Sequence, residues 1–256
     1  MKFDDRESRR VESIYLTPDV VAQRARVLEA LALQRGERVA DLGCGPGLLA
    51  LDMAHRVGMQ GAVHGVDASA SMLTIAARRC YGKAWVQLAL GDVTKLPYPD
   101  NYFDAVVCTQ VYEYVADIDG ALRELQRVLR PGGRAVLVDT DWESCIWNSS
   151  NPVRMRNVIE AWDRHCSHPH LPLTLAARSR AAGLLPGKME VVVLLNDRLD
   201  PNTYSFGMIT TLATWAKKHL DEQQARDWAE DLRILGERGE YFFSLNRYLL
   251  VVEKPK

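Results

Sequence analysis

An apolar run that ends in an acidic residue and a glycine-rich turn, V-A-D-L-G-C-G-P-G at residues 39–47, is followed at once by a helical pattern. Gly43 and Gly45 have no Cβ, so a small molecule can lie almost against the main chain of such a turn. Dinucleotide-binding turns use G-x-G-x-x-G for a pyrophosphate and place an acid about 20 residues later. Here the spacing is G-x-G-x-G and Asp41 precedes the first glycine by two residues, which would repel a pyrophosphate and suits a cationic ligand.

Apolar runs and helical patterns alternate along most of the chain. A first helix is expected over 18–33, because Thr17 offers a capping hydroxyl ahead of Pro18 at the first helical position. Strands are expected at 38–42, 62–66, 85–90, 103–109, 134–140, 189–195 and 241–252, and helices at 46–57, 69–80, 117–130 and 173–182. This pattern predicts an α/β fold, a seven-stranded and mostly parallel sheet with helices on both faces, whose ligands bind at the carboxyl ends of the strands.

Two insertions are too long to be simple connections between these elements. One is the segment 142–172, and the other contains a helical pair at 202–219 and 221–237. We therefore expect helical caps on a core, in the order N-terminal helical lid 1–37, cofactor-binding core 38–141, cap insertion 142–172, core continued 173–199, helical cap insertion 200–239 and last core strand 240–256.

The composition argues against polymer and membrane partners. The 32 basic and 33 acidic residues give a net charge of −1, so no charge excess favours nucleic acid or an anionic membrane. The charged N-terminus and the absence of an uninterrupted apolar stretch of about 18 residues predict a cytoplasmic protein. The five cysteines are scattered without a C-x-x-C pair, which indicates neither a disulfide framework nor a zinc site. The oligomeric state stays open.

Acidic residues recur at three successive strand ends. Asp67 follows Asp41 by 26 residues, and Asp92 follows Asp67 by 25, a spacing that fits one helix and one strand each time. Because the carboxyl ends of parallel strands share one edge of the sheet, we expect the three carboxylates to face the same ligand.

Several motifs occur in the order and spacing of one family: residues 39–47, V-H-G-V-D-A-S-A-S-M at 63–72, G-D-V at 91–93, L-P-Y-P-D-N-Y-F-D at 96–104 and L-R-P-G-G-R at 129–134. Together they resemble the class I S-adenosylmethionine-dependent methyltransferases, in the small-molecule group (methyltransferase type 11) that includes quinone C-methyltransferases and arsenite methyltransferases. The resemblance covers about residues 10–140. It implies a Rossmann-like fold, S-adenosyl-L-methionine as cofactor with S-adenosyl-L-homocysteine as product, and O-, N- or C-methylation of a small-molecule acceptor.

The resemblance also implies a set of cofactor-binding residues: Tyr15, Arg24, Asp41, Gly43, Gly45, Asp67, Ala68, Met72, Gly91, Asp92, Val93 and Gln110. In that assignment the glycine turn takes the methionine end, with Asp41 near its ammonium and sulfonium. Asp67 takes both ribose hydroxyls, while Met72 and Asp92 contact the adenine. Two assignments have structural alternatives, since Tyr15 could pack on the core instead of closing over the cofactor, and Arg24 could be a solvated helix charge instead of a partner of the methionine carboxylate.

The acceptor is expected above the ends of the fourth and fifth strands. A sulfonium methyl is already activated, so alignment of the reactants is the main requirement and a metal is not expected. If the nucleophile needs a general base, the candidates are Glu113, Asp141 and His165. Three tryptophans, Trp142, Trp147 and Trp162, could line an acceptor pocket or simply pack in a core.

Two rival functions remain open at this level. The chain could bind S-adenosylmethionine without transferring its methyl group, as a sensor or a cyclase. It could instead be a nucleotide-dependent oxidoreductase, although Asp41 beside the turn opposes a pyrophosphate.

Overall fold

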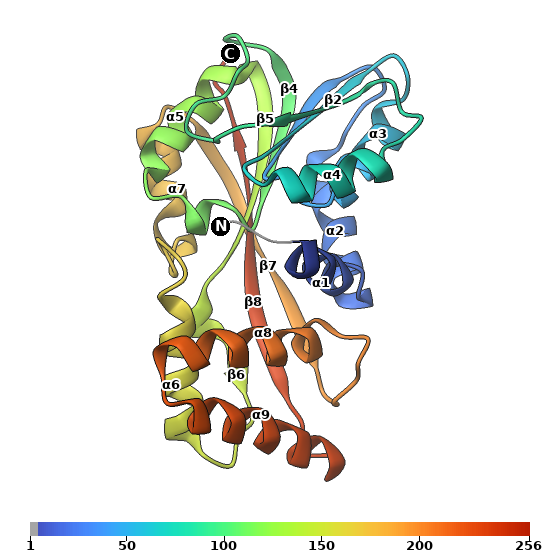
Figure 1. Ribbon diagram of the computed structural model, residues 1–256. Helices are drawn as coiled ribbons and strands as arrows, with labels where there is room; N and C mark the ends of the chain where they lie inside the picture. Colours follow the sequence, from blue (N-terminus) through green and yellow to red (C-terminus); the bar gives the residue numbers. More distant parts are fainter. Residues whose placement is uncertain (1–4) are drawn as a thin grey trace.

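The computed structural model describes residues 5–256 and places seven long strands in one sheet (Figure 1). Five run parallel: β1 (Arg38–Leu42), β2 (Ala62–Asp67), β3 (Val86–Leu90), β4 (Phe103–Thr109) and β5 (Leu129–Thr140). The other two are β8 (Phe243–Glu253), antiparallel to β5, and β7 (Leu185–Asn196), antiparallel to β8. The order is β3-β2-β1-β4-β5-β8, with β7 beside β8. The predicted seven-stranded, mostly parallel α/β fold is confirmed, and the two-residue strand β6 (Ile146–Trp147) adds a short pairing to β8.

Helices cover both faces of the sheet because successive side chains of each buried strand point to opposite faces. In β4, Ala105 and Val107 pack with the face covered by α2 (Pro18–Leu31) and α3 (Leu48–Val57). Their neighbours Val106 and Cys108 pack with the face covered by α5 (Ile118–Val128) and α7 (Pro172–Ala181). A strand segment buried on both sides is expected to be apolar, as β4 is from Ala105 to Cys108.

Three further helices form a lobe below the carboxyl ends of the parallel strands in the view of Figure 1. They are α6 (Pro152–Asp163), α8 (Tyr204–His219) and α9 (Glu222–Glu237), which pack against one another. Their shared core contains Trp228, Trp162 and Trp147 and includes Phe243 from the first residue of β8. This lobe corresponds to the two expected insertions, while the domain boundaries themselves stay predictions.

An N-terminal helix that the sequence reading did not expect, α1 (Asp5–Tyr15), packs between α2, α4 (Ala70–Arg79) and α8. Its contact with α8 is close, because a Cβ on Gly207 would lie 2.5 Å from Cγ1 of Ile14. The expected lid at 1–37 thus consists of α1 and α2, and its first four residues lie outside the described part. Few apolar residues mark α1, which explains why its pattern was missed.

Two other local expectations need correction. The helix α2 does begin at Pro18, but the Thr17 hydroxyl does not cap it and donates instead to the Ile14 carbonyl at 2.7 Å, because α1 ends immediately before. The helix α6 was not expected, although Asn151 caps it by accepting from the Arg154 amide at 2.9 Å and Pro152 occupies its first turn. Among the described helices, none combines the length and apolar character needed to cross a bilayer.

The helical lobe is expected to depend on one indole. Trp228 is fully buried, lies 5.3 Å from the Trp147 ring in an edge-to-face arrangement, and donates to Sδ of Met155 at 3.0 Å. We expect Trp228→Ala to lower the free energy of unfolding by about 3–5 kcal/mol in chemical denaturation, because it leaves a large cavity. Tyr81→Ala, at a side chain 89% exposed, is the control and should change it by less than about 0.5 kcal/mol. A loss for Trp228→Ala no larger than the control's would contradict this role.

Candidate functional site

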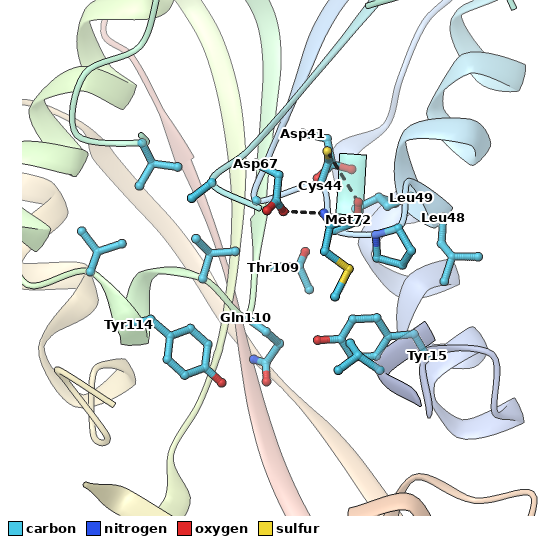
Figure 2. Close-up of a pocket in the computed structure, with 18 of the residues that line it drawn as sticks. Tyr15, Asp41, Cys44, Leu48, Leu49, Asp67, Met72, Thr109, Gln110 and Tyr114 are labelled. Carbon is cyan, nitrogen blue, oxygen red and sulfur yellow. Dashed lines mark hydrogen bonds between the residues drawn. The ribbon is translucent and has the colours of Figure 1, made fainter. Parts of the chain in front are cut away.

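A pocket of about 570 Å³ lies at the carboxyl ends of β1 to β4, where a parallel α/β sheet places its ligands (Figure 2). This volume is in the range of small-molecule and cofactor sites. The structure brings every predicted cofactor-binding residue to its wall: Tyr15, Arg24, Asp41, Gly43, Gly45, Asp67, Ala68, Met72, Gly91, Asp92, Val93 and Gln110. Residues far apart in the sequence therefore converge on one cavity.

The glycine turn after β1 is tight, and two of its glycines have different tasks. Gly43 has a φ of +72°, and a Cβ there would lie 2.1 Å from Cγ2 of Val111, so the turn packs directly against the chain that follows β4. Gly45 has a φ of +51°, and a Cβ there would meet no atom within 4 Å. The first glycine thus permits close packing, and the second leaves backbone facing open space in the pocket.

Asp67 connects this turn to the next one. Its Oδ2 accepts from the Gly45 amide at 2.8 Å and its Oδ1 accepts from the Ser69 amide at 2.8 Å. The Ser69 side chain in turn caps α4, which carries Met72 into the pocket wall. An ionised carboxylate has about four acceptor positions, so two backbone amides leave it able to receive hydroxyl donors from a ligand.

Asp41 is buried at the end of β1 and is 2% exposed. Burial raises its pKa to about 7, with repulsion from Asp67 as a further cause. Its Oδ2 has no hydrogen-bond partner within the described part of the protein, although it lies in the wall of the pocket. A cationic ligand in the cavity would supply the missing partner of this buried carboxylate oxygen.

The end of the pocket nearest β3 carries Asp92, just after that strand. Its Oδ1 accepts from both the amide and the hydroxyl of Thr94, each at 2.8 Å, which fixes the side chain. Both of these bonds use one oxygen, so the other can accept from a ligand. Gly91 and Val93 flank Asp92 in the same wall.

Gln110 follows β4 in a left-handed backbone conformation, with a φ of +57°. Such a conformation is costly for a residue other than glycine and concentrates at functional sites. Thr140 holds the side chain by donating its hydroxyl to Gln110 Oε1 at 2.6 Å. The hydroxyl ends of Tyr15 and Tyr114 point toward Gln110 from opposite sides of the cavity in Figure 2. The three side chains delimit its deeper end.

Arg24 lines the pocket but is engaged with the protein itself. Its Nε lies 2.8 Å from Oδ2 of Asp52, and its Nη1 donates to the Tyr15 carbonyl at 3.2 Å. The guanidinium therefore ties α2 to α3 and to the end of α1. It is not a solvated helix charge, since only 15% of its side chain is exposed.

None of the three candidate bases lines the pocket. Glu113 is fully buried and accepts from the Thr140 amide at 3.2 Å. Asp141 accepts from Nδ1 of His170 at 2.9 Å, which raises the pKa of His170. His165 packs on Trp162 with ring centroids 3.6 Å apart, and burial lowers its pKa to about 4, so this imidazole is neutral at physiological pH.

Glu113 nevertheless lies directly behind the pocket wall. Burial raises its pKa to about 7, and its Oε1 has no hydrogen-bond partner within the described part of the chain, while its neighbour Tyr114 does line the pocket. Its amide donates to Oδ1 of Asp139 at 3.2 Å, and burial together with Glu113 raises the pKa of Asp139 well above its usual range. A cluster of buried carboxyls therefore stands behind Tyr114.

The three tryptophans lie outside the pocket. Trp142, Trp147 and Trp162 are buried in the core of the helical lobe and are not part of the pocket wall, so core packing is the correct one of the two alternatives. Over the described residues, no group of three His, Cys, Asp or Glu side chains is arranged to hold a metal ion.

The polar residues of the pocket wall that were not predicted from the sequence include Gln23 and Arg247. A signal for Arg247 existed, because Phe243, Leu245, Arg247 and Leu249 alternate along β8 and share its buried face. An arginine on the apolar face of a strand is unusual enough to deserve a functional reading.

Comparison with known proteins gives a family match over part of the chain. Residues 40–137 match the family model described as a methyltransferase domain. The 2-phytyl-1,4-naphtoquinone methyltransferase of Synechococcus elongatus is 42% identical over 111 residues, which cover 42% of this chain and 48% of that protein. The chain thus spans less than half the length of this curated relative.

Solved structures share the fold over nearly the whole chain. The phosphoethanolamine N-methyltransferase 2 of Haemonchus contortus, bound to phosphomonomethylethanolamine and S-adenosylhomocysteine, superposes with a TM-score of 0.65 at 17% identity, over 99% of this chain and 59% of that one. The [4+2]-cyclase SpnF superposes with a TM-score of 0.60 at 23% identity, over 92% and 82% of the two chains. These two structures show the fold, and the family match identifies residues 40–137 as similar to a methyltransferase domain.

Proposed function

We propose that the chain is a methyltransferase that carries the methyl group of S-adenosylmethionine to a small-molecule acceptor. The observation that supports this most directly is the convergence of twelve independently predicted cofactor residues on one pocket at the carboxyl ends of the strands. The pocket suits the cofactor, because it offers an unpartnered buried carboxylate oxygen on Asp41 for its cationic end and open space at Gly45 for close approach.

In this proposal the cofactor supplies a methyl group already activated on sulfonium. The chain orients it along the edge of the sheet: Asp92 accepts from the adenine amine, Asp67 from the ribose hydroxyls, and Asp41 faces the cationic centres. Tyr15 and Gln110 bound the cavity where the methyl group would point. Holding donor and acceptor in line is the main catalytic contribution, since it removes the entropic cost of their encounter.

A base, where the acceptor needs one, would act through Tyr114. Of the three predicted candidates, Glu113 adjoins Tyr114 in the chain and has a buried Oε1 without a hydrogen-bond partner among the described residues. The Tyr114 phenol would take the acceptor proton while passing its own proton to the ionised Glu113 carboxylate. Asp141 lies outside the pocket wall, and the lowered pKa of His165 makes it a weak base although its ring centroid lies 5.3 Å from that of Tyr114, so we assign them no step.

A small-molecule acceptor, which the sequence predicts, is part of the proposed function. The pocket has the size of a small-molecule site, and the chain has no charge excess that would draw it to nucleic acid. The Synechococcus relative is named a 2-phytyl-1,4-naphtoquinone methyltransferase, and this name assigns quinone methylation to that protein. The acceptor-side wall of this chain contains polar residues that the family match, which stops at residue 137, does not cover.

Calorimetry tests the cofactor assignment. We expect saturable binding of S-adenosylhomocysteine and none of NAD, because Asp41 and Asp67 would repel a pyrophosphate. Asp67→Asn should weaken S-adenosylhomocysteine by about tenfold or more, since a charged acceptor of two hydroxyls is lost. Asp119→Asn, at a half-exposed carboxylate outside the pocket, is the matched control. Saturable binding of NAD alone would overturn the assignment.

Methyl transfer itself is tested with radiolabelled S-adenosylmethionine and a broad panel of small phenols, amines, carboxylic acids and quinones. We expect label in at least one acceptor and production of S-adenosylhomocysteine that depends on that acceptor. Tight cofactor binding without transfer to any compound would favour the rival function, a sensor or a cyclase.

The pKa of Asp41 predicts a pH dependence of cofactor binding. A raised carboxyl pKa means that the free protein holds a proton on Asp41 below about pH 7, and a cationic ligand must displace it. The affinity for S-adenosylhomocysteine should therefore rise from about pH 5.5 to pH 7 by up to about tenfold per pH unit and then level off.

Asp41→Asn should bind more weakly and lose this pH dependence, as measured by calorimetry across the range. Glu113→Gln, which removes the other carboxyl whose pKa is about 7, is the control and should keep it. An unchanged pH profile in Asp41→Asn would show that Asp41 does not face the cationic end.

A further inference from the structure

Arg247 is a buried cation in the wall of the pocket. Its residue is 2% exposed, although arginine is among the side chains least often found inside a protein. It belongs to β8, where it pairs with Thr140 of β5 on one side and Val192 of β7 on the other. Two neighbours hold it: Nη1 donates to Oε1 of Gln23, and the guanidinium lies 4.6 Å above the ring centroid of Tyr204.

This guanidinium lacks the partners that usually accompany a buried charge. Within the described part of the chain, it has no carboxylate at salt-bridge distance, and its Nε has no hydrogen-bond acceptor. Gln23 and the tyrosine ring are neutral. Burying a charge without a counter-ion is costly, so a ligand that supplies an anion at this point would be favoured.

The nearest acidic groups compensate only in part. Glu113 and Asp139 are both fully buried and interact electrostatically with Arg247. Burial raises the pKa of both carboxyls, which favours their neutral forms. They stand behind the pocket wall, since neither of them lines the cavity that Arg247 does line.

The strand order separates Arg247 from the cofactor residues. Asp92, Asp67 and Asp41 stand at the ends of β3, β2 and β1, which are consecutive in the sheet. From β1 the sheet continues through β4 and β5 to β8, so Arg247 lies three strand spacings, about 14 Å, beyond the strand of Asp41. Gln110 and Thr140 occupy the intervening strand ends. In the binding mode proposed above for the cofactor, the guanidinium would therefore stand beyond the methyl group, on the acceptor side.

We infer that Arg247, positioned by Gln23, binds an anionic group of the acceptor, so that the substrate is a small molecule carrying a carboxylate or phosphate. This inference rests on the proposed function, because it defines the acceptor end of the same pocket. Guanidinium donors match the oxygens of both groups, and the partial burial of the pocket strengthens such charge-assisted hydrogen bonds.

The test uses the full chain saturated with S-adenosylhomocysteine and two pairs of probes of similar shape, benzoate with benzamide and phenyl phosphate with benzyl alcohol. We expect calorimetry to show binding of at least one anion and at least about tenfold weaker binding of its neutral partner. If no anion binds at millimolar concentration, or the neutral partner binds equally well, the inference is wrong.

Variants then assign the effect to the guanidinium. Arg247→Met should weaken the anion by about tenfold or more, and Arg247→Lys by less, while both keep the affinity for S-adenosylhomocysteine within about twofold. Arg154→Met is the matched control, because it removes another partly buried guanidinium, in the helical lobe and outside the pocket. A selective loss of S-adenosylhomocysteine affinity in Arg247→Met would assign the guanidinium to the methionine carboxylate and overturn the inference.

Gln23→Glu keeps the test decisive if Arg247→Met folds poorly. It places a carboxylate beside Arg247, so the anionic probe should be excluded in a protein that gains an ion pair and retains its fold. Unchanged anion binding in Gln23→Glu would contradict the inference. Failure of the wild-type chain to bind S-adenosylhomocysteine at all would instead refute the proposed function, which keeps the two failures distinct.

Discussion

The carboxylate of Asp67 joins two turns that follow different strands, and the pocket depends on this junction. One oxygen accepts a hydrogen bond from the Gly45 amide, and the other accepts one from the Ser69 amide. The turns after β1 and β2 are therefore held as one unit. Charge-assisted hydrogen bonds to backbone amides are among the stronger ones in a protein. With the first turn fixed, Gly43 packs on Val111 beyond β4, and with the second fixed, α4 begins where Ser69 caps it.

The strand order places the polar groups of the pocket in a row along one edge of the sheet. Each carboxyl end from β3 to β4 presents a polar group to the same cavity, although helices and loops separate these residues in the sequence. The line continues past β5 to β8, where the sheet reverses direction and contributes Arg247 from the middle of a strand instead of from its end. A ligand lying along this edge would therefore meet acidic groups first and a cationic group last.

The sequence was sufficient for the core and insufficient for the acceptor side, and the physical reason differs for each. Residues of the glycine turn, Asp67 and Asp92 belong to short local motifs whose geometry is set by the strand–turn–helix unit itself, so all twelve predicted cofactor residues reach the pocket. The three candidate bases, Glu113, Asp141 and His165, were predicted from their chemical type and their approximate position in the sequence. The rotation of a short helical turn decides whether such a side chain faces a cavity or a core. Glu113 faces inward while its neighbour Tyr114 lines the pocket.

The strand β8 passes through two hydrophobic cores, because Phe243 packs in the helical lobe and Val252 packs between the sheet and its helices. Along this length β7 pairs with it from Phe243 to Glu253. A swing of the lobe relative to the sheet would have to shear this two-stranded ladder, and many backbone hydrogen bonds would break together. Arg247 belongs to this same strand, so the position of its guanidinium in the pocket is set by the preformed ladder and not by a movement of the lobe, whose helices α6, α8 and α9 contribute no residue to the pocket wall.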